Sequence, residues 1–163
     1  MDTAPFTLEI TQDAPAVFHA PSCSGSLDLR LGCCMDAMKT FPDGHFDLAI
    51  VDPPYGIGIA ANPVRQAHAP KAWDAAAPGA EYFAELRRVS KHQIVWGANH
   101  FIERLPINSA CWIVWDKRDG TVPDDGSDAE LAWTNLGGAL RTFRHAWRGL
   151  ARASETGAPH LHP

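Results

Sequence analysis

The sequence predicts an α/β fold built from layers of strands and helices. An apolar, partly β-branched run at 48–51 is typical of a buried strand, and a second such run follows at 93–96. Between them, residues 79–89 carry apolar side chains at helical spacing, which predicts an amphipathic helix. Because strand, helix and strand alternate, we expect a layered α/β sheet. Two later strands, expected at 130–134 and 140–147, have no helix between them, so part of the sheet is expected to be antiparallel.

The N-terminal part of the chain carries weaker signals. The first 26 residues are rich in Pro, Ala, Ser and Thr, which predicts an irregular leader. Residues 27–31 alternate apolar and charged side chains and predict a half-buried strand. A short helix at 36–40 and a turn at Pro42-Asp43-Gly44 then lead to the strand at 48–51.

The middle of the chain predicts one more core strand among loops. Residues 99–105 are expected to form a short helix with Asn99 as its N-cap. An apolar run with two tryptophans at 111–115 predicts the third core strand. Few apolar anchors occur at 56–74 and 116–128, so both segments predict loops, and the first is expected to be mobile over the neighbouring corner of the chain.

The domain organisation and broad class follow from length and composition. At 163 residues, with 45% hydrophobic and 20% charged residues, the chain suits one ordinary globular domain. We expect residues 27–150 to form the folded region and 151–163 to be a polar tail. No apolar run approaches the roughly 18 residues of a membrane span, and the N-terminus lacks a secretory basic cluster. These features predict a cytoplasmic protein without membrane contact.

Charge and cysteine usage narrow the class further. A net charge of −5 argues against a protein that coats nucleic acid generally, because such proteins are basic. The four cysteines include no C-x-x-C pair, so neither a zinc nor a redox site is expected. One local exception is the segment 131–154, which has four arginines and no acid. It predicts either a solvated face or a phosphate-contacting edge; its arginines are Arg141, Arg144, Arg148 and Arg152.

The corner Asp52-Pro53-Pro54-Tyr55 directly follows the strand predicted at 48–51. Two prolines make the turn stiff and leave no N–H for a strand ladder. In open α/β sheets, ligands bind at the carboxyl ends of strands. A carboxylate and free carbonyls accept hydrogen bonds, and a tyrosine offers a flat face for stacking. The corner therefore suits an exocyclic amine on a heteroaromatic base, although a strand that simply ends in Asp-Pro, with Tyr55 as packing, would have the same sequence.

The next six residues, 56–61, mimic the dinucleotide fingerprint G-x-G-x-x-A. That fingerprint needs its glycines directly after a strand and at the start of a helix. Here a Pro-Pro corner intervenes, so we do not expect a phosphate-binding loop.

The sequence resembles the S-adenosylmethionine-dependent amino-methyltransferases of DNA, whose signature is the tetrapeptide at 52–55. The approach to this corner, 38–58, also looks like the family, and the similarity covers most of 29–149. Further segments follow in the order seen in the phage and restriction-modification branch. They are Lys71-Ala72-Trp73-Asp74, Tyr82-Phe83, Arg88-Val89-Ser90-Lys91, Trp96-Gly97, Trp112-Ile113-Val114-Trp115-Asp116-Lys117 and Glu130-Leu131-Ala132-Trp133-Thr134.

The resemblance implies a Rossmann-like methyltransferase sheet of mixed strands with flanking helices. It also implies site-specific methylation of adenine N6 in double-stranded DNA, because Asp at the first motif position is typical of the adenine enzymes. The target adenine would be flipped out of the duplex and stacked on Tyr55. Asp52 and the Pro53 carbonyl would accept hydrogen bonds from its amine, while Pro54 stiffens the turn. No metal is implied.

The same resemblance implies where the cofactor binds. In this branch the catalytic half precedes the cofactor half, which follows a short segment beginning His-Pro. His162-Pro163 look like the start of that segment, so we expect the C-terminal cofactor strands to be missing. The chain alone is then expected to bind S-adenosylmethionine weakly, and a second chain or the missing half would complete the site. Candidate cofactor-binding residues are Asp52, His162 and Pro163.

Two alternatives stay open. One keeps the enzyme but changes the acceptor to cytosine N4. The other is a non-catalytic remnant that binds DNA or a protein partner, in which Arg141, Arg144 and Arg148 would contact phosphates and Asp52 would not matter.

Overall fold

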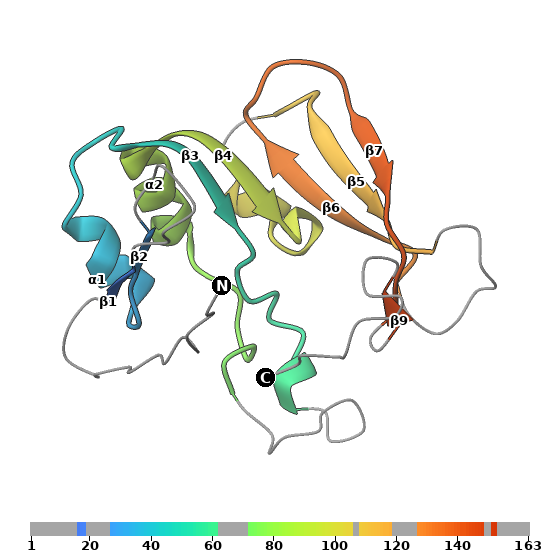
Figure 1. The fold of residues 1–163 in the computed structure, drawn as a ribbon, viewed down its shortest axis with the longest axis horizontal. Helices are drawn as coiled ribbons and strands as arrows, with labels where there is room; N and C mark the ends of the chain where they lie inside the picture. The colour runs from blue at the N-terminus through green and yellow to red at the C-terminus, as the bar shows by residue number, and fades with distance from the viewer. Residues whose placement is uncertain are drawn as a thin grey trace, which may run out of the picture. The chain divides into compact units, whose positions relative to one another are not determined.

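A computed structural model of the protein shows two compact units, Met1–Phe41 and Pro42–Pro163 (Figure 1). It describes residues 16–18, 27–61, 72–105, 108–118, 127–148 and 151–152. The boundary between the units falls after the first helix and not at residue 26, where the leader was expected to end.

The first unit contains a short hairpin and one helix. Strand β1 (Ala16–Phe18) pairs antiparallel with β2 (Leu27–Leu29), and helix α1 spans Cys34–Lys39. The expected leader therefore contains a strand, and the expected strand at 27–31 ends at Leu29. The expectation that this strand is half-buried was wrong, since Leu29 is 47% and Leu31 82% exposed. A two-stranded pair has no second layer of its own to cover its apolar side chains.

The second unit begins with the predicted strand–helix–strand segment. Strand β3 (Phe46–Val51) is followed by helix α2 (Ala80–Val89) and strand β4 (Ser90–Trp96), and the two strands are parallel. The predicted turn before β3 is confirmed: the His45 N–H donates to the Pro42 carbonyl at 3.3 Å. Gly44 has a φ of +63°, which the turn requires and which glycine adopts without strain.

Three further strands complete a five-stranded mixed sheet of order β3-β4-β6-β5-β7. Strand β6 (Ala129–Thr134) is antiparallel to both β4 and β5 (Trp112–Asp116), while β5 is parallel to β7 (Arg141–Arg144). The predicted α/β class and the antiparallel part of the sheet are confirmed. The strand expected at 140–147 is shorter, because the chain leaves the sheet and forms a separate pair, β8 (Trp147–Arg148) with β9 (Ala151–Arg152).

The helix expected at 99–105 is replaced by two 3₁₀ turns, η2 (Ala98–His100) and η3 (Ile102–Arg104). Their backbone bonds run between residues three apart, as in the His100 N–H to Gly97 carbonyl bond of 2.9 Å. Asn99 lies inside η2 and does not cap a helix.

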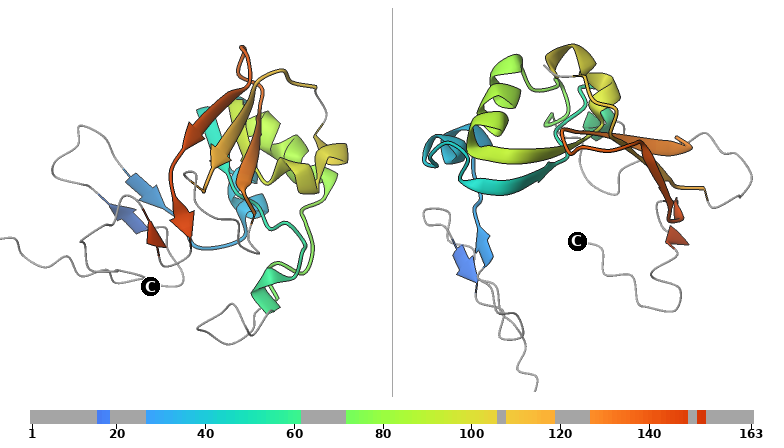
Figure 2. Two further views of the ribbon diagram at one scale, coloured as in Figure 1. Left: turned by 90° about the vertical axis from the view of Figure 1, so that its right-hand side faces the viewer. Right: turned by 90° about the horizontal axis from the view of Figure 1, so that it is seen from above.

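The two faces of this sheet differ in cover. Helix α2 and the 3₁₀ turns lie on one side, as the right panel of Figure 2 shows. On that covered face, Val95 and its register partner Trp133 are 1% and 3% exposed. The opposite, open face carries apolar side chains from β3, which is an edge strand of the described sheet. Its alternate residues Phe46, Leu48 and Ile50 are 36%, 43% and 63% exposed.

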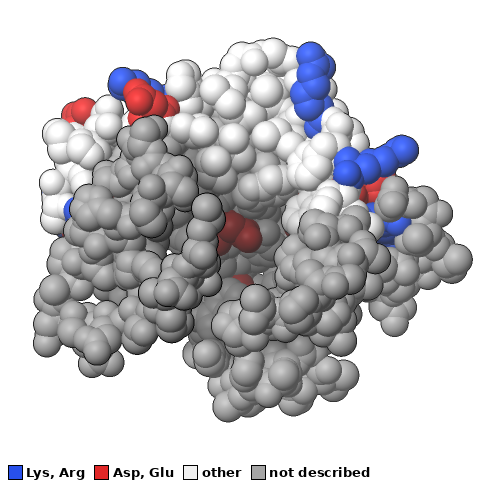
Figure 3. All heavy atoms as spheres, in the orientation of Figure 1, with Lys and Arg blue, Asp and Glu red and all other residues white. Residues whose placement is uncertain are grey.

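The expectation that 48–51 is a buried strand was therefore wrong for one of its faces. Within the described residues of the second unit, no strand pairs with the outer edge of β3, and no helix covers its Leu48 and Ile50 side. Apolar content predicts a strand but does not say whether another layer lies against each face. Figure 3, in the orientation of Figure 1, shows a broad area over the strands without charged side chains, and Lys and Arg lie at its margin.

No helix within the described ranges is long and apolar enough to cross a membrane.

Candidate active site at the carboxyl end of strand β3

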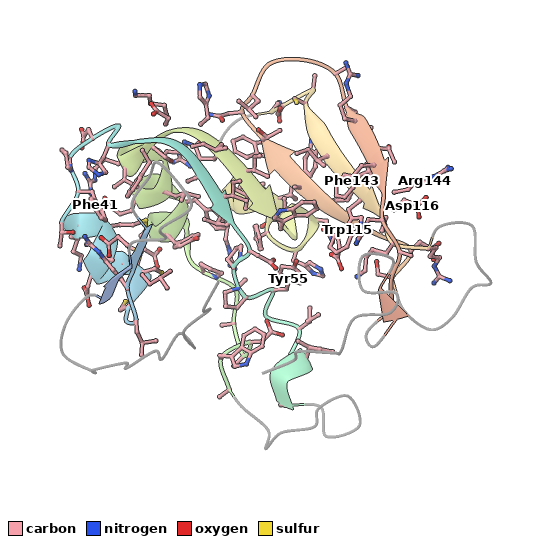
Figure 4. The ribbon with its side chains drawn as sticks, viewed as in Figure 1. Phe41, Tyr55, Trp115, Asp116, Phe143 and Arg144 are labelled. Carbon is pink, nitrogen blue, oxygen red and sulfur yellow. The ribbon has the colours of Figure 1, made fainter. Side chains whose placement is uncertain are left out.

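The corner lies directly after β3, at the carboxyl end of two neighbouring parallel strands (Figure 4). Asp52 is exposed, Pro53 is buried and Tyr55 is half-buried. The Tyr55 hydroxyl donates a hydrogen bond of 2.8 Å to Asp52 Oδ1. The buried proline fixes the backbone between the two side chains, so both face the same end of the sheet. A carboxylate has about four acceptor sites, so Asp52 keeps capacity for donors other than Tyr55.

The Tyr55 phenol is held in its protonated form. Partial burial raises its pKa well above the ordinary value of 10.0, and the hydrogen bond to Asp52 raises it further. The negative charges of Asp52, Glu130 and Asp74 act in the same direction. Tyr55 therefore acts as a hydrogen-bond donor and a stacking surface, not as a base.

The backbone of Gly97 lies against the Tyr55 ring. Gly97 has a φ of +66°, and a Cβ placed on it would lie 2.0 Å from Tyr55 Cε1. Its N–H donates to the Leu131 carbonyl at 2.9 Å, which anchors this turn to the neighbouring strand β6. Only glycine satisfies both the left-handed backbone and the close approach.

A second ring contacts Tyr55. The imidazole of His100, at the end of η2, stacks on the tyrosine with ring centroids 4.7 Å apart and an interplanar angle of 13°. His100 is exposed, whereas the neighbouring Phe101 is buried and tilts toward Tyr55 at 6.5 Å. One face of the Tyr55 ring thus already contacts an aromatic side chain of the chain itself.

Asp74 organises the segment after the corner. Its carboxylate is 1% exposed and accepts backbone hydrogen bonds of 2.9 Å from both Gly56 and Ile59. Burial acts to raise the pKa of Asp74, but hydrogen bonds from the backbone N–H groups of Gly56, Ile59, Tyr55 and Ile57 outweigh it, and the pKa is lowered. The carboxylate stays charged and holds the chain from Tyr55 to the 3₁₀ turn η1 (Ile59–Ala61).

This geometry explains the glycines at 56 and 58. Both have positive φ, and a Cβ on Gly56 would lie 2.6 Å from the backbone nitrogen of Ala77. Successive N–H groups in such a turn form an anion-binding nest. The anion here is the chain's own Asp74, so the G-x-G pattern makes an internal anchor.

The open face beside the corner carries three packed aromatic rings. Trp96, at the end of β4, lies edge-on to Trp115 at 6.1 Å, and Trp115 stacks on Phe143 at 6.0 Å and 10°. Figure 4 shows Trp115 and Phe143 beside each other at the far strands of the sheet. Lys117 lies 5.7 Å from the Trp115 ring and forms an ion pair of 2.6 Å with Glu130.

The arginines expected to contact DNA do not share one surface. Arg141 and Arg144 are both exposed, but they lie three residues apart on β7 and so project from opposite faces of the sheet. Arg144 also pairs with Asp116 at 3.0 Å. Arg148 lies on β8, and its side chain is outside the described residues, as is that of Arg152.

The other cofactor candidates, His162 and Pro163, lie outside the described residues, as does the part of the expected mobile loop at 62–71. Asp52 is thus the one candidate cofactor residue in the described part, and it does not make up a site for S-adenosylmethionine. Among the described residues, no group of three or more His, Cys, Asp or Glu side chains is arranged to hold a metal ion.

Reasoning from the sequence assigned no role to Asp74, Gly97 or His100. Asp74 and Gly97 did lie in segments that carry the family resemblance, and the two glycines at 56 and 58 signalled an unusual turn. Nothing local in the sequence pairs residue 74 with residue 56, or residue 100 with residue 55, because both contacts form only when separate parts of the chain fold together.

Comparison with known proteins adds no assignment: no protein-family model matches the chain, and no curated protein is significantly similar to it.

Proposed function

We propose that this chain carries the base-binding corner of a DNA amino-methyltransferase that acts on adenine N6. The observation that supports it most directly is the Asp52–Tyr55 pair, an exposed carboxylate and a stacking ring joined by a 2.8 Å hydrogen bond at the carboxyl end of β3. Had Asp52 been buried in a packing role, the proposal would have no acceptor to offer. The Rossmann-like part of the proposal rests on the mixed α/β sheet, and the family resemblance supplies the identity of the reaction.

The residues of the corner would act on the amine of the flipped base. Its lone pair is delocalised into the ring, which makes it a poor nucleophile. Asp52 and the Pro53 carbonyl would accept its two N–H groups and favour a tetrahedral nitrogen whose lone pair is localised. As positive charge develops on the nitrogen, the fixed Asp52 carboxylate would stabilise it. Tyr55 would hold the ring plane and, through its hydroxyl, the Asp52 side chain.

S-adenosylmethionine, when bound, would supply the methyl group: the N–C bond would form as the S–C bond breaks, S-adenosylhomocysteine would leave, and the amine would release one proton to solvent. The described residues do not include a site for S-adenosylmethionine, so nothing in the corner is assigned to its binding beyond the exposed Asp52 carboxylate. A second chain, or residues outside the described ranges, would provide that site.

The test needs no knowledge of the target sequence. Genomic DNA is incubated with the protein and S-adenosylmethionine and digested, and modified nucleosides are measured by mass spectrometry. Where a second chain or further residues complete the cofactor site, N6-methyladenine is expected, and Asp52→Ala should abolish it. Asp47→Ala is the matched control, because Asp47 is an exposed carboxylate on the same strand that pairs with Lys91 on the surface.

Other outcomes separate the alternatives. N4-methylcytosine would keep the chemistry and change the acceptor. If no modified base forms, a duplex with a mismatched 2-aminopurine tests the corner alone, because this base becomes fluorescent on leaving the stack. A different result would refute the proposal and favour a binding module. In that case duplex binding weakens with added salt and with Arg141→Ala, Asp52→Ala has no effect on it, and the 2-aminopurine fluorescence does not rise.

A further inference from the structure

We propose that the His100 imidazole occupies the stacking face of Tyr55 in the free protein and that a flipped base takes its place. This inference rests on the proposed function and concerns how the same corner is kept closed until DNA binds. It begins with the near-parallel stack of the two rings, at 4.7 Å and 13°. A flat nitrogen heterocycle supplied by the chain thus occupies the position at which a flat nitrogen heterocycle is expected as substrate.

Among the described groups that contact Tyr55, His100 is the one that can leave without breaking the fold. Gly97 is fixed by its N–H bond to Leu131 in β6, and Phe101 is 3% exposed. Moving either would break sheet hydrogen bonds or open the core. His100 sits at the last position of η2 with an exposed side chain. Its backbone N–H bond to the Gly97 carbonyl holds the turn whether or not the ring is stacked.

The hydrogen bond of Tyr55 shows why the tyrosine itself stays in place. Its hydroxyl is tied to Asp52, and the next residue, Gly56, donates its backbone N–H to the buried Asp74 at 2.9 Å. The tyrosine is therefore fixed at both ends, and an exchange of stacking partner requires only a rotation of the His100 side chain. Such rotations of exposed residues take place in picoseconds to nanoseconds and do not limit binding.

The stack makes a quantitative prediction. A stacked aromatic pair stabilises by about 0.5–1.5 kcal/mol, so removing the imidazole should tighten base binding about two- to tenfold. If His100 instead stacked on the bound base and helped to hold it, removing the imidazole would weaken base binding.

The experiment measures binding of a duplex with a mismatched 2-aminopurine by fluorescence titration. His100→Ala should bind two- to tenfold more tightly than the unchanged protein, and His100→Phe, which keeps a flat ring on Tyr55, should bind equally or more weakly. His92→Ala is the control, because His92 is an exposed histidine on β4, four residues before the end of that strand at Trp96. Equal or weaker binding by His100→Ala would overturn the inference.

A second measurement follows His100 directly. Ring protons stacked on a tyrosine are shifted by its ring current, so the His100 proton resonances in the free protein should move toward ordinary values when the duplex binds. If 2-aminopurine fluorescence rises while these resonances stay fixed, the base does not displace His100, and this inference fails while the proposed function stands. If no variant gives a fluorescence change, the proposed function fails and this inference with it.

Discussion

The corner after β3 and the strand β7 were both expected to be functional, yet the corner is held by buried contacts and β7 is exposed. At the corner, Asp74 is buried and bonded to backbone N–H groups, and Gly97 is packed against a ring. On β7 all four residues are exposed, and Arg144 has a surface ion pair with Asp116. Buried contacts hold the residues of the corner in one conformation, whereas exposed side chains on a strand can adopt several. We therefore expect chemistry that needs fixed atoms at the corner and not on β7.

The largest expected effect on stability comes from substitution of Asp74. In Asp74→Asn, one acceptor oxygen becomes an amide NH2 group that faces an N–H donor, so that backbone donor loses its partner inside the fold. Each buried unsatisfied group costs about 1–3 kcal/mol, and we expect the free energy of unfolding to fall by about 2–3 kcal/mol. Chemical denaturation measures it. A loss below about 0.5 kcal/mol would mean that the corner is no more fixed than the exposed strand.

The pH dependence of stability tests the role of Asp74 in a second way. The folded-state pKa of Asp74 is lowered below its ordinary 3.8, so its stabilising contribution is present above that value and is lost as the pH falls through the lowered folded value. The stability of the unchanged protein should drop in this range, and Asp74→Asn should drop less steeply. Unfolding midpoints measured against pH give the two slopes, and equal slopes would show that Asp74 is not the titrating anchor.

Gly97→Ala comes next in size. An alanine there must adopt a left-handed backbone, which costs about 1–2 kcal/mol, and its Cβ must push the Tyr55 ring aside. We expect the free energy of unfolding to fall by at least that amount, and we expect base binding to weaken. The control is Gly44→Ala, which is also left-handed but whose Cβ has no neighbour nearer than 4.0 Å. If both variants lose the same stability and neither changes base binding, the contact with Tyr55 has no role.

The smallest effect is expected on β7. Arg144→Ala removes an ion pair whose arginine side chain is 73% exposed, and such pairs contribute about 0–1 kcal/mol. We expect the free energy of unfolding to change by less than about 0.5 kcal/mol, with added salt reducing even that difference. A loss near that of Asp74→Asn in the same denaturation assay would remove the distinction between the two regions.

Much of the fold was predictable because its signals are local. The helix predicted at 79–89 and the strands predicted at 48–51, 93–96 and 111–115 correspond to α2, β3, β4 and β5, because apolar periodicity is a property of neighbouring residues. The turn before β3 follows from Pro42 and Gly44 in the same way. The exposure of β3 was not predictable, because an apolar run has the same sequence whether or not another layer covers it.

The sequence by itself determined a stiff corner: two prolines after a strand leave Asp52 and Tyr55 at its carboxyl end wherever the rest of the chain goes. Only the tertiary structure decided what surrounds that corner. Asp74 reaches it across 18 positions from Gly56, and Gly97 and His100 reach Tyr55 from the end of another strand. Backbone stiffness is a property of adjacent residues, whereas a buried carboxylate or a stacked ring finds its partner only when the sheet brings distant segments together.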